Sequence, residues 1–204
     1  GMPNWSASQL SAGKSCSSQP KTPLLAVAEN YTICPLTIDL PTNLAFPARD
    51  TFQACKDVSG MRQWVERELG LPTGASFPHR FWFGDHWLPI VLTAKGPLYA
   101  EAIGEGETPN AYQQPVDLSD RQRQPLYHLA QKLLETLAAP PAVYLLQFGW
   151  QDGRAIFDRL WPFPAAPAIA SLGVQEPDLF ACHWHCLREM PLYDVAIAPA
   201  NLTV

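Results

Sequence analysis

Residues 119–161 decide the fold, and they read SDRQRQPLYHLAQKLLETLAAPPAVYLLQFGWQDGRAIFDRLW. The first half carries one apolar stripe at three- and four-residue spacing, which predicts an amphipathic helix. Ser119 and Gln122 stand at the spacing of a capping box, which predicts where this helix begins. Pro140 and Pro141 predict where it has ended. The stripe is formed by Leu126, Leu129, Ala130, Leu133, Leu134 and Leu137.

The second half of this stretch predicts a β-hairpin. Residues 142–150 and 154–161 are two runs rich in β-branched and aromatic side chains. Asp152-Gly153 lies between them, and Asp-Gly between apolar runs is a strong hairpin signal. One hairpin therefore follows one helix directly.

The remaining chain predicts further strands and two further helices. Ser59, the apolar residues after it and a stop at Gly70 predict a helix, and 178–189 predicts another. Pro89 predicts that its strand is an edge strand or carries a bulge. Apolar runs between turn signals predict strands over 24–38, 81–83, 87–93, 98–103 and 192–197.

These elements define the expected fold class and organisation. Clusters of strands with two or three helices between them predict an α+β fold with a mainly antiparallel sheet. Residues 1–22 are rich in Ser, Gln, Lys and Pro and predict a flexible tail, so 23–204 should form a single α+β domain. We expect 104–115 to be a polar loop and the proline-rich 162–167 to be extended.

Composition excludes several functional classes. Apolar residues make up 47% of the chain and charged residues 16%, which is typical of a chain that folds. The net charge is −5 and the 14 Lys and Arg are scattered, so nucleic-acid binding is not expected. No apolar run approaches the roughly 20 residues that span a bilayer. Five cysteines, an odd and loosely spaced set, favour a reducing compartment, and we predict a cytoplasmic protein.

One segment, 182–186, concentrates residues of the kind that bind metals. On a helix, Cys182, His185 and Cys186 would share one face. Thiolate and imidazole ligands suit zinc, so a zinc-stabilised interaction module is one hypothesis. No second Cys pair provides a fourth ligand at familiar spacing, and isolated thiols more often pack as small apolar residues. The sequence leaves both interpretations open.

The order of elements around His79-Arg80-Phe81, Asp117-Leu118-Ser119-Asp120, Leu145-Leu146-Gln147-Phe148 and 157–162 resembles the C-terminal lobe of ATP-grasp ligases. The resemblance implies a partial ATP-grasp-like lobe. In that family a hairpin carries an acid on its first strand and Glu-x-Asn on its second, because Mg²⁺ on nucleotide phosphates prefers hard oxygen ligands.

The chain departs from the family pattern at the metal ligands. Gln147 stands where the first acid would stand, and Arg159 and Trp161 stand where Glu and Asn would stand. Asp158 could replace one ligand by a one-residue shift, but such a shift turns the side chain to the other face of the sheet. The resemblance therefore implies that magnesium–ATP chemistry is lost.

Three functional hypotheses follow from the sequence. The first is a non-catalytic domain that binds a small molecule or a protein partner through an aromatic-lined surface, with Arg80, Trp82, Gln147, Asp158 and Arg159 as candidate ligand-binding residues. The second is an enzyme that handles an anionic substrate through Arg80, Asp158 and Arg159, since guanidinium groups pair two-pronged with carboxylate or phosphate. The third is the zinc module.

Overall fold

The computed structural model describes residues 31–41, 43–76 and 84–198, which belong to one compact unit of the chain. Several expectations lie outside these residues. They are the tail over 1–22, the first part of the strand over 24–38, the strand over 81–83, and the candidate residues Arg80 and Trp82.

The described residues form four α-helices, two 3₁₀ helices and eight strands. The helical segments are α1 Arg49–Lys56, α2 Val58–Leu69, η1 Gly74–Ser76, α3 Asp120–Thr136, η2 Ala166–Ser171 and α4 Leu179–Leu187. The strands are β1 His86–Thr93, β2 Gly96–Tyr99, β3 Ala102–Glu105, β4 Tyr112–Val116, β5 Ala142–Gln151, β6 Arg154–Trp161, β7 Gln175–Glu176 and β8 Ala196–Ile197.

Six of the strands form one antiparallel sheet in the order β4-β3-β1-β5-β6, with β2 also paired to β1. The remaining two, β7 and β8, pair separately. The expected α+β class with a mainly antiparallel sheet is confirmed. The number of helices is higher than expected, because α1 was not predicted.

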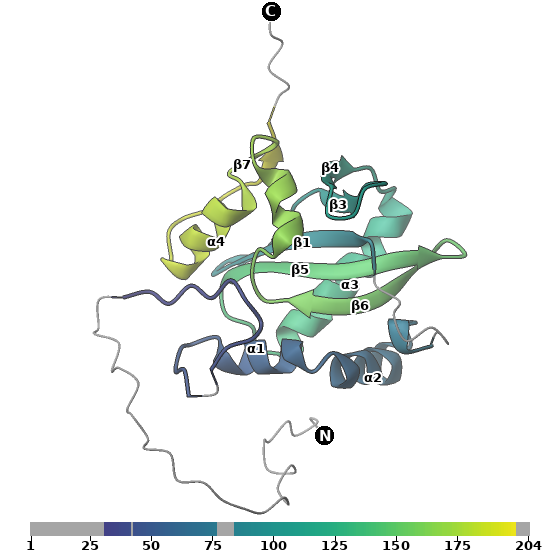
Figure 1. Cartoon of the computed structure of the whole chain (residues 1–204), viewed down its shortest axis with the longest axis horizontal. Helices are drawn as coiled ribbons and strands as arrows, with labels where there is room; N and C mark the ends of the chain where they lie inside the picture. The colour runs from purple at the N-terminus through teal and green to yellow at the C-terminus, as the bar shows by residue number, and fades with distance from the viewer. Residues whose placement is uncertain (1–30, 42, 77–83, 199–204) are drawn as a thin grey trace, which may run out of the picture. The chain divides into compact units, whose positions relative to one another are not determined.

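Each face of the large sheet is covered by helices (Figure 1). On one face, α2 and α3 pack on side chains such as Leu88, Tyr144 and Leu146. On the other face, η2 and α4 pack on the alternate side chains, such as Val143 and Leu145. Strand β5 is buried on both faces, which explains its nearly continuous apolar sequence.

The stretch that decides the fold has the expected structure. The backbone N–H of Ser119 donates to Gln122 Oε1 at 2.9 Å, which is one half of the capping box before α3. Strands β5 and β6 pair antiparallel across Asp152 and Gly153, whose φ angles are 50° and 72°. Positive φ at both positions is what a two-residue hairpin requires, and glycine adopts it without strain.

Several expected elements are wrong in extent or type. Residues 31–38 contain no strand, 166–171 form a 3₁₀ helix, and the expected loop over 104–115 lies partly in strands, with 104–105 in β3 and 112–115 in β4. The strand over 192–197 is reduced to the two residues of β8. For the strands the partner segment decides, because a strand exists only where another edge accepts its hydrogen bonds.

Two local signals also need correction. Helix α2 is capped by Asp57, whose side chain accepts from the backbone N–H of Gly60 at 2.9 Å, rather than by Ser59. Pro89 lies in a central strand, not at an edge. Pro89 pairs with Leu145 of β5, but its carbonyl points to the other side, where it accepts from the N–H of Ala100 at 3.1 Å. On that side the neighbour of β1 changes from β3 to β2 and neither pairing includes Pro89, so its missing N–H removes no ladder bond.

Within the described residues, no helix is both long enough and apolar enough to cross a lipid bilayer.

Candidate functional site

Asp158 lies at an irregularity in the hairpin. Gln147 pairs with Arg159 and Phe148 pairs with Phe157, so Asp158 is the extra residue of a bulge in β6. A bulge redirects the side chain that it carries. The Asp158 side chain reaches Arg62 on α2, whereas Gln147 bonds Trp161, which packs with the layer of α4.

The Asp158 carboxylate is fully buried and both of its oxygens are engaged. Oδ1 forms an ion pair with the guanidinium of Arg62 and also accepts from Arg159 Nε at 3.3 Å. Oδ2 accepts from the backbone N–H of Gly84 at 2.9 Å. Arg62 Nε also donates to the backbone carbonyl of Asp158 at 2.9 Å. Asp158 therefore fastens α2 and the segment before β1 to the hairpin.

Gln147 is satisfied within the protein as well. Its Nε2 donates to the backbone carbonyl of Gly84 at 2.6 Å, and its Oε1 accepts from Trp161 Nε1 at 2.9 Å. The guanidinium of Arg159 lies 5.5 Å from the centre of the Trp161 ring, within cation–π range. The positions that resemble the metal-ligand positions of ATP-grasp enzymes thus hold a network of an amide, an indole and a guanidinium.

Gly84 is the meeting point of these contacts. Its N–H binds Asp158 and its carbonyl binds Gln147, so the two side chains hold one peptide segment from both sides. A Cβ at this position would lie 2.4 Å from the backbone carbonyl of Phe148. Only glycine allows this close approach of two backbones.

The structure brings together three of the five predicted ligand-binding residues, namely Gln147, Asp158 and Arg159. Sequence reasoning missed Arg62 and Gly84. Arg62 directly follows the apolar Met61 on α2, and an arginine at the margin of an apolar stripe is a signal that could have suggested a buried partner. The sequence around Gly84 indicated only a turn and not its contacts with Asp158 and Gln147.

The cysteine and histidine cluster lies on α4. Cys182 and Cys186 are buried in the core between α4 and the sheet, and burial raises the pKa of Cys182 to about 12 and that of Cys186 to about 11. The Cys182 thiol donates to the carbonyl of Pro177 at 3.4 Å. Buried neutral thiols are poor metal ligands and poor nucleophiles. Among the residues that the structure describes, no group of three His, Cys, Asp or Glu is placed to hold a metal ion.

His183 is a buried histidine of the same helix. Its Nδ1 accepts from the backbone N–H of Val143 at 3.1 Å, which leaves the ring proton on Nε2. Burial lowers the pKa of His183 to about 4, because the charged imidazolium would lose its hydration. The histidine is therefore neutral at pH 7 and joins α4 to β5.

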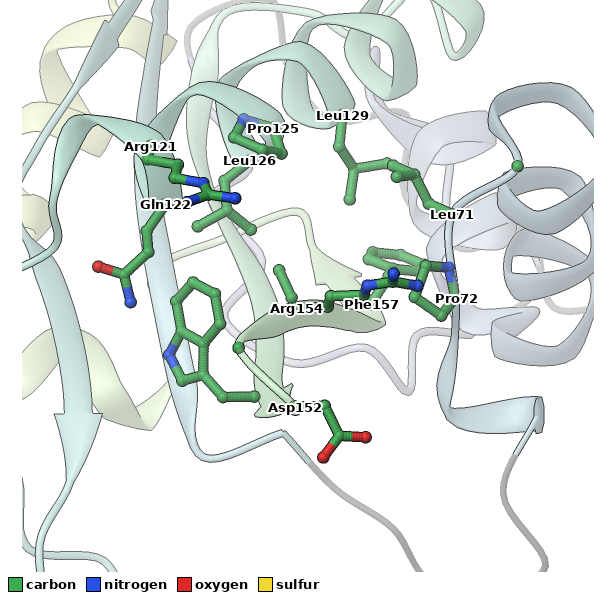
Figure 2. Close-up of a pocket in the computed structure, with 14 residues that line it drawn as sticks. Leu71, Pro72, Arg121, Gln122, Pro125, Leu126, Leu129, Asp152, Arg154 and Phe157 are labelled. Atoms are coloured by element: carbon green, nitrogen blue, oxygen red, sulfur yellow. The ribbon is translucent and has the colours of Figure 1, made fainter.

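Aromatic residues of the hairpin also line a surface hollow of about 630 Å³ beside α3 (Figure 2). Trp150 of β5 and Phe157 of β6 both contribute to its lining. The hollow lies on the α3 face of the sheet, opposite the α4 layer with which Trp161 packs.

The fold and the hairpin together define a class: the chain resembles part of the C-terminal lobe of ATP-grasp enzymes, with the metal-ligand positions not retained. Comparison with models of known protein families finds no match.

Two solved structures share the fold. Glycinamide-RNase-transformylase T from Mycobacterium tuberculosis has a TM-score of 0.58 at 17% identity, over 73% of this chain and 53% of that chain. N5-carboxyaminoimidazole ribonucleotide synthetase from Thermus thermophilus has a TM-score of 0.60 at 12% identity, over 74% of this chain and 57% of that chain.

A sequence relative is formate-dependent phosphoribosylglycinamide formyltransferase from Haloquadratum walsbyi, 26% identical over 113 residues, which are 54% of this chain and 28% of the relative. The chain thus spans little more than half the length of the two solved structures and about a quarter of this relative.

Proposed function

We propose that this chain is a non-catalytic domain that binds a small molecule or a protein partner and that its hairpin no longer holds a magnesium–nucleotide complex. The observation that carries the proposal is the state of Asp158. This carboxylate has no exposed surface, and Arg62, Arg159 and Gly84 occupy its oxygens. A carboxylate buried in this way has no surface that a ligand could reach.

The other hairpin residues do not fit a magnesium ion either. Mg²⁺ takes carboxylate oxygens and keeps several waters in an octahedral shell. Gln147 offers a neutral amide whose oxygen already accepts from Trp161, and Arg159 places a positive charge where a cation would lie. The residue types at the positions that resemble metal-ligand positions therefore oppose metal binding.

The network supports a structural role for the former catalytic positions. Asp158 and Gln147 hold Gly84 just before β1, and Arg62 ties α2 to Asp158. The enzyme hypothesis needs Asp158 to touch an anionic substrate, which its complete burial opposes. We therefore favour binding over catalysis.

Magnesium-dependent nucleotide binding tests the proposal. Thermal unfolding would be followed with ATP in the presence of Mg²⁺, with ATP in the presence of EDTA, and with Mg²⁺ alone. A ligand at a hundred times its dissociation constant raises the unfolding free energy by about 2.7 kcal/mol, so a retained site would be visible. We expect no stabilisation that requires both ATP and Mg²⁺. A clear rise in Tm that appears only with both would contradict the proposal.

Metal analysis of the purified protein tests the zinc module. Zinc at one equivalent per chain would support it, and its absence at that level would remove it. The buried thiols of Cys182 and Cys186 lead us to expect no stoichiometric zinc.

A further inference from the structure

A hollow on the α3 face of the sheet has the size and walls of a ligand pocket. Its volume of about 630 Å³ falls within the range of roughly 300–1,000 Å³ that is typical of small-molecule sites. Three parts of the chain enclose it: the end of α2 with Leu71 and Pro72, the first turns of α3, and the tip of the β5–β6 hairpin (Figure 2).

The walls of the hollow are held in place by contacts within the protein. Trp150 on β5 packs edge-on against Phe148, with ring centroids 5.4 Å apart and planes at 89°. The backbone N–H of Phe157 donates to the carbonyl of Pro72 at 3.1 Å, which ties the α2–η1 connection to β6. A pre-formed wall lowers the entropy cost of binding.

Apolar groups make up the inner part of the hollow. Leu126 and Leu129 of α3 and Phe157 of β6 are buried and contribute to its lining, and the partly exposed indole of Trp150 forms a further side. Such a surface favours a planar apolar ring over a hydrated, purely polar ligand.

Two guanidinium groups give the hollow its charge. Arg121 on α3 and Arg154 on β6 both line it and are exposed, and neither guanidinium has a hydrogen-bond or ion-pair partner among the described residues. Asp152 is the one acidic residue among the described residues of the lining, so their formal charge is +1 in a chain whose net charge is −5. A guanidinium without a partner can bind carboxylate or phosphate in a two-pronged manner.

We propose that this hollow binds a planar aromatic compound that bears a carboxylate or phosphate group, with the ring on Trp150 and the anion between Arg121 and Arg154. The inference rests on the proposed function and names the class of small molecule that the domain takes. The site is separate from the network around Gln147 and Trp161, whose members do not line the hollow.

Metal-free titration of simple probes tests this inference. The probes are 1-naphthyl phosphate, 1-naphthoate, neutral 1-naphthol and inorganic phosphate, all in EDTA. Binding is followed by the NMR signals of isotope-labelled indole N–H groups, with Trp150→Leu used to assign the signal of Trp150. We expect at least one naphthyl anion to shift that signal and to bind at least about tenfold more tightly than 1-naphthol or phosphate. The better of the two anions identifies the preferred acid group.

Charge variants supply the decisive comparison. Arg121→Gln together with Arg154→Gln should weaken binding of the naphthyl anion at least about tenfold and leave 1-naphthol unaffected. Arg67→Gln is the matched control, because Arg67 is an exposed arginine of α2 that does not line the hollow. Since the side chains of Arg121 and Arg154 bond no other group in the described part of the chain, the Tm of the double variant should match that of the parent protein.

The outcomes for the two proposals can be told apart. Failure of both naphthyl anions to shift the Trp150 signal at about 1 mM, or equal binding by the double variant, would overturn the inference about the hollow. Neither result affects the proposal that the hairpin lacks a magnesium–nucleotide site. Stabilisation that requires both ATP and Mg²⁺ would overturn that proposal, whatever the naphthyl probes do.

Discussion

Replacing Arg62 by methionine should destabilise the protein strongly, because it leaves the Asp158 carboxylate buried without its main counter-charge. The side chain of Arg62 is 16% exposed and that of Asp158 is fully buried. Removing one partner of a buried ion pair typically costs about 3–5 kcal/mol. Arg159 and the Gly84 N–H remain on the carboxylate, so we expect about 3 kcal/mol, the lower end of that range.

The matched control is Arg67→Met, five residues further along α2. Arg67 pairs with Glu68 on the surface, where its side chain is 60% exposed. Exposed ion pairs contribute about 0–1 kcal/mol, so this variant should be close to the parent protein. Both substitutions replace an arginine by the same residue in the same helix, so helix propensity differs little between them.

Urea denaturation measures the effect, with the m-value checked for a common unfolded state. A loss of about 3 kcal/mol corresponds to a fall in Tm of about 6–12 °C for a chain of this size. A double-mutant cycle with Asp158→Asn should give a coupling energy above about 1 kcal/mol for Arg62 and none for Arg67. If Arg62→Met costs less than about 1 kcal/mol, the buried pair does not hold the hairpin and the reasoning fails.

Three further predictions concern the glycine before β1 and two sets of buried side chains on α4. Gly84→Ala should cost about 1–3 kcal/mol, because the new Cβ meets the Phe148 backbone at 2.4 Å; a urea midpoint equal to that of the parent would contradict the close packing. His183 has a folded pKa of about 4 against the ordinary 6.5. The contribution of the neutral histidine to the free energy of unfolding should therefore be complete above pH 6.5 and fall by up to about 3 kcal/mol as the pH approaches 4. His183→Gln should flatten that part of the pH profile, and an unchanged slope would exclude the histidine as its cause. The thiols of Cys182 and Cys186 should react with a thiol reagent at pH 8 only after denaturant is added; rapid labelling of the native protein would show that α4 is not packed as described.

The sequence predicted the local elements that rest on strong periodicity or turn chemistry. The leucine stripe of α3 and the Asp152-Gly153 turn were predicted correctly, since helical spacing and positive φ act within a few residues. Elements that depend on a distant partner were predicted poorly. Strand β4 was taken for a loop because its polar sequence pairs only through β3.

The candidate site was also predictable only in its local properties. Residue types told us that Gln147, Arg159 and Trp161 do not provide magnesium ligands, because charge and donor chemistry are properties of the side chain itself. The bulge that redirects Asp158 could not be predicted, because it depends on the register between two strands. The same holds for Arg62 and Gly84, which lie 96 and 74 residues before Asp158 in the chain.

The amino-acid sequence by itself determined the α+β class, the central helix and hairpin, and the absence of acidic residues at the former metal-ligand positions. Tertiary structure alone decided that the carboxylate of Asp158 is paired with Arg62 inside the protein and that Trp150, Arg121 and Arg154 border one hollow. The physical reason is the range of the forces involved: backbone conformation and side-chain charge are local, whereas ion pairing and cavity formation depend on which distant segments the fold brings together.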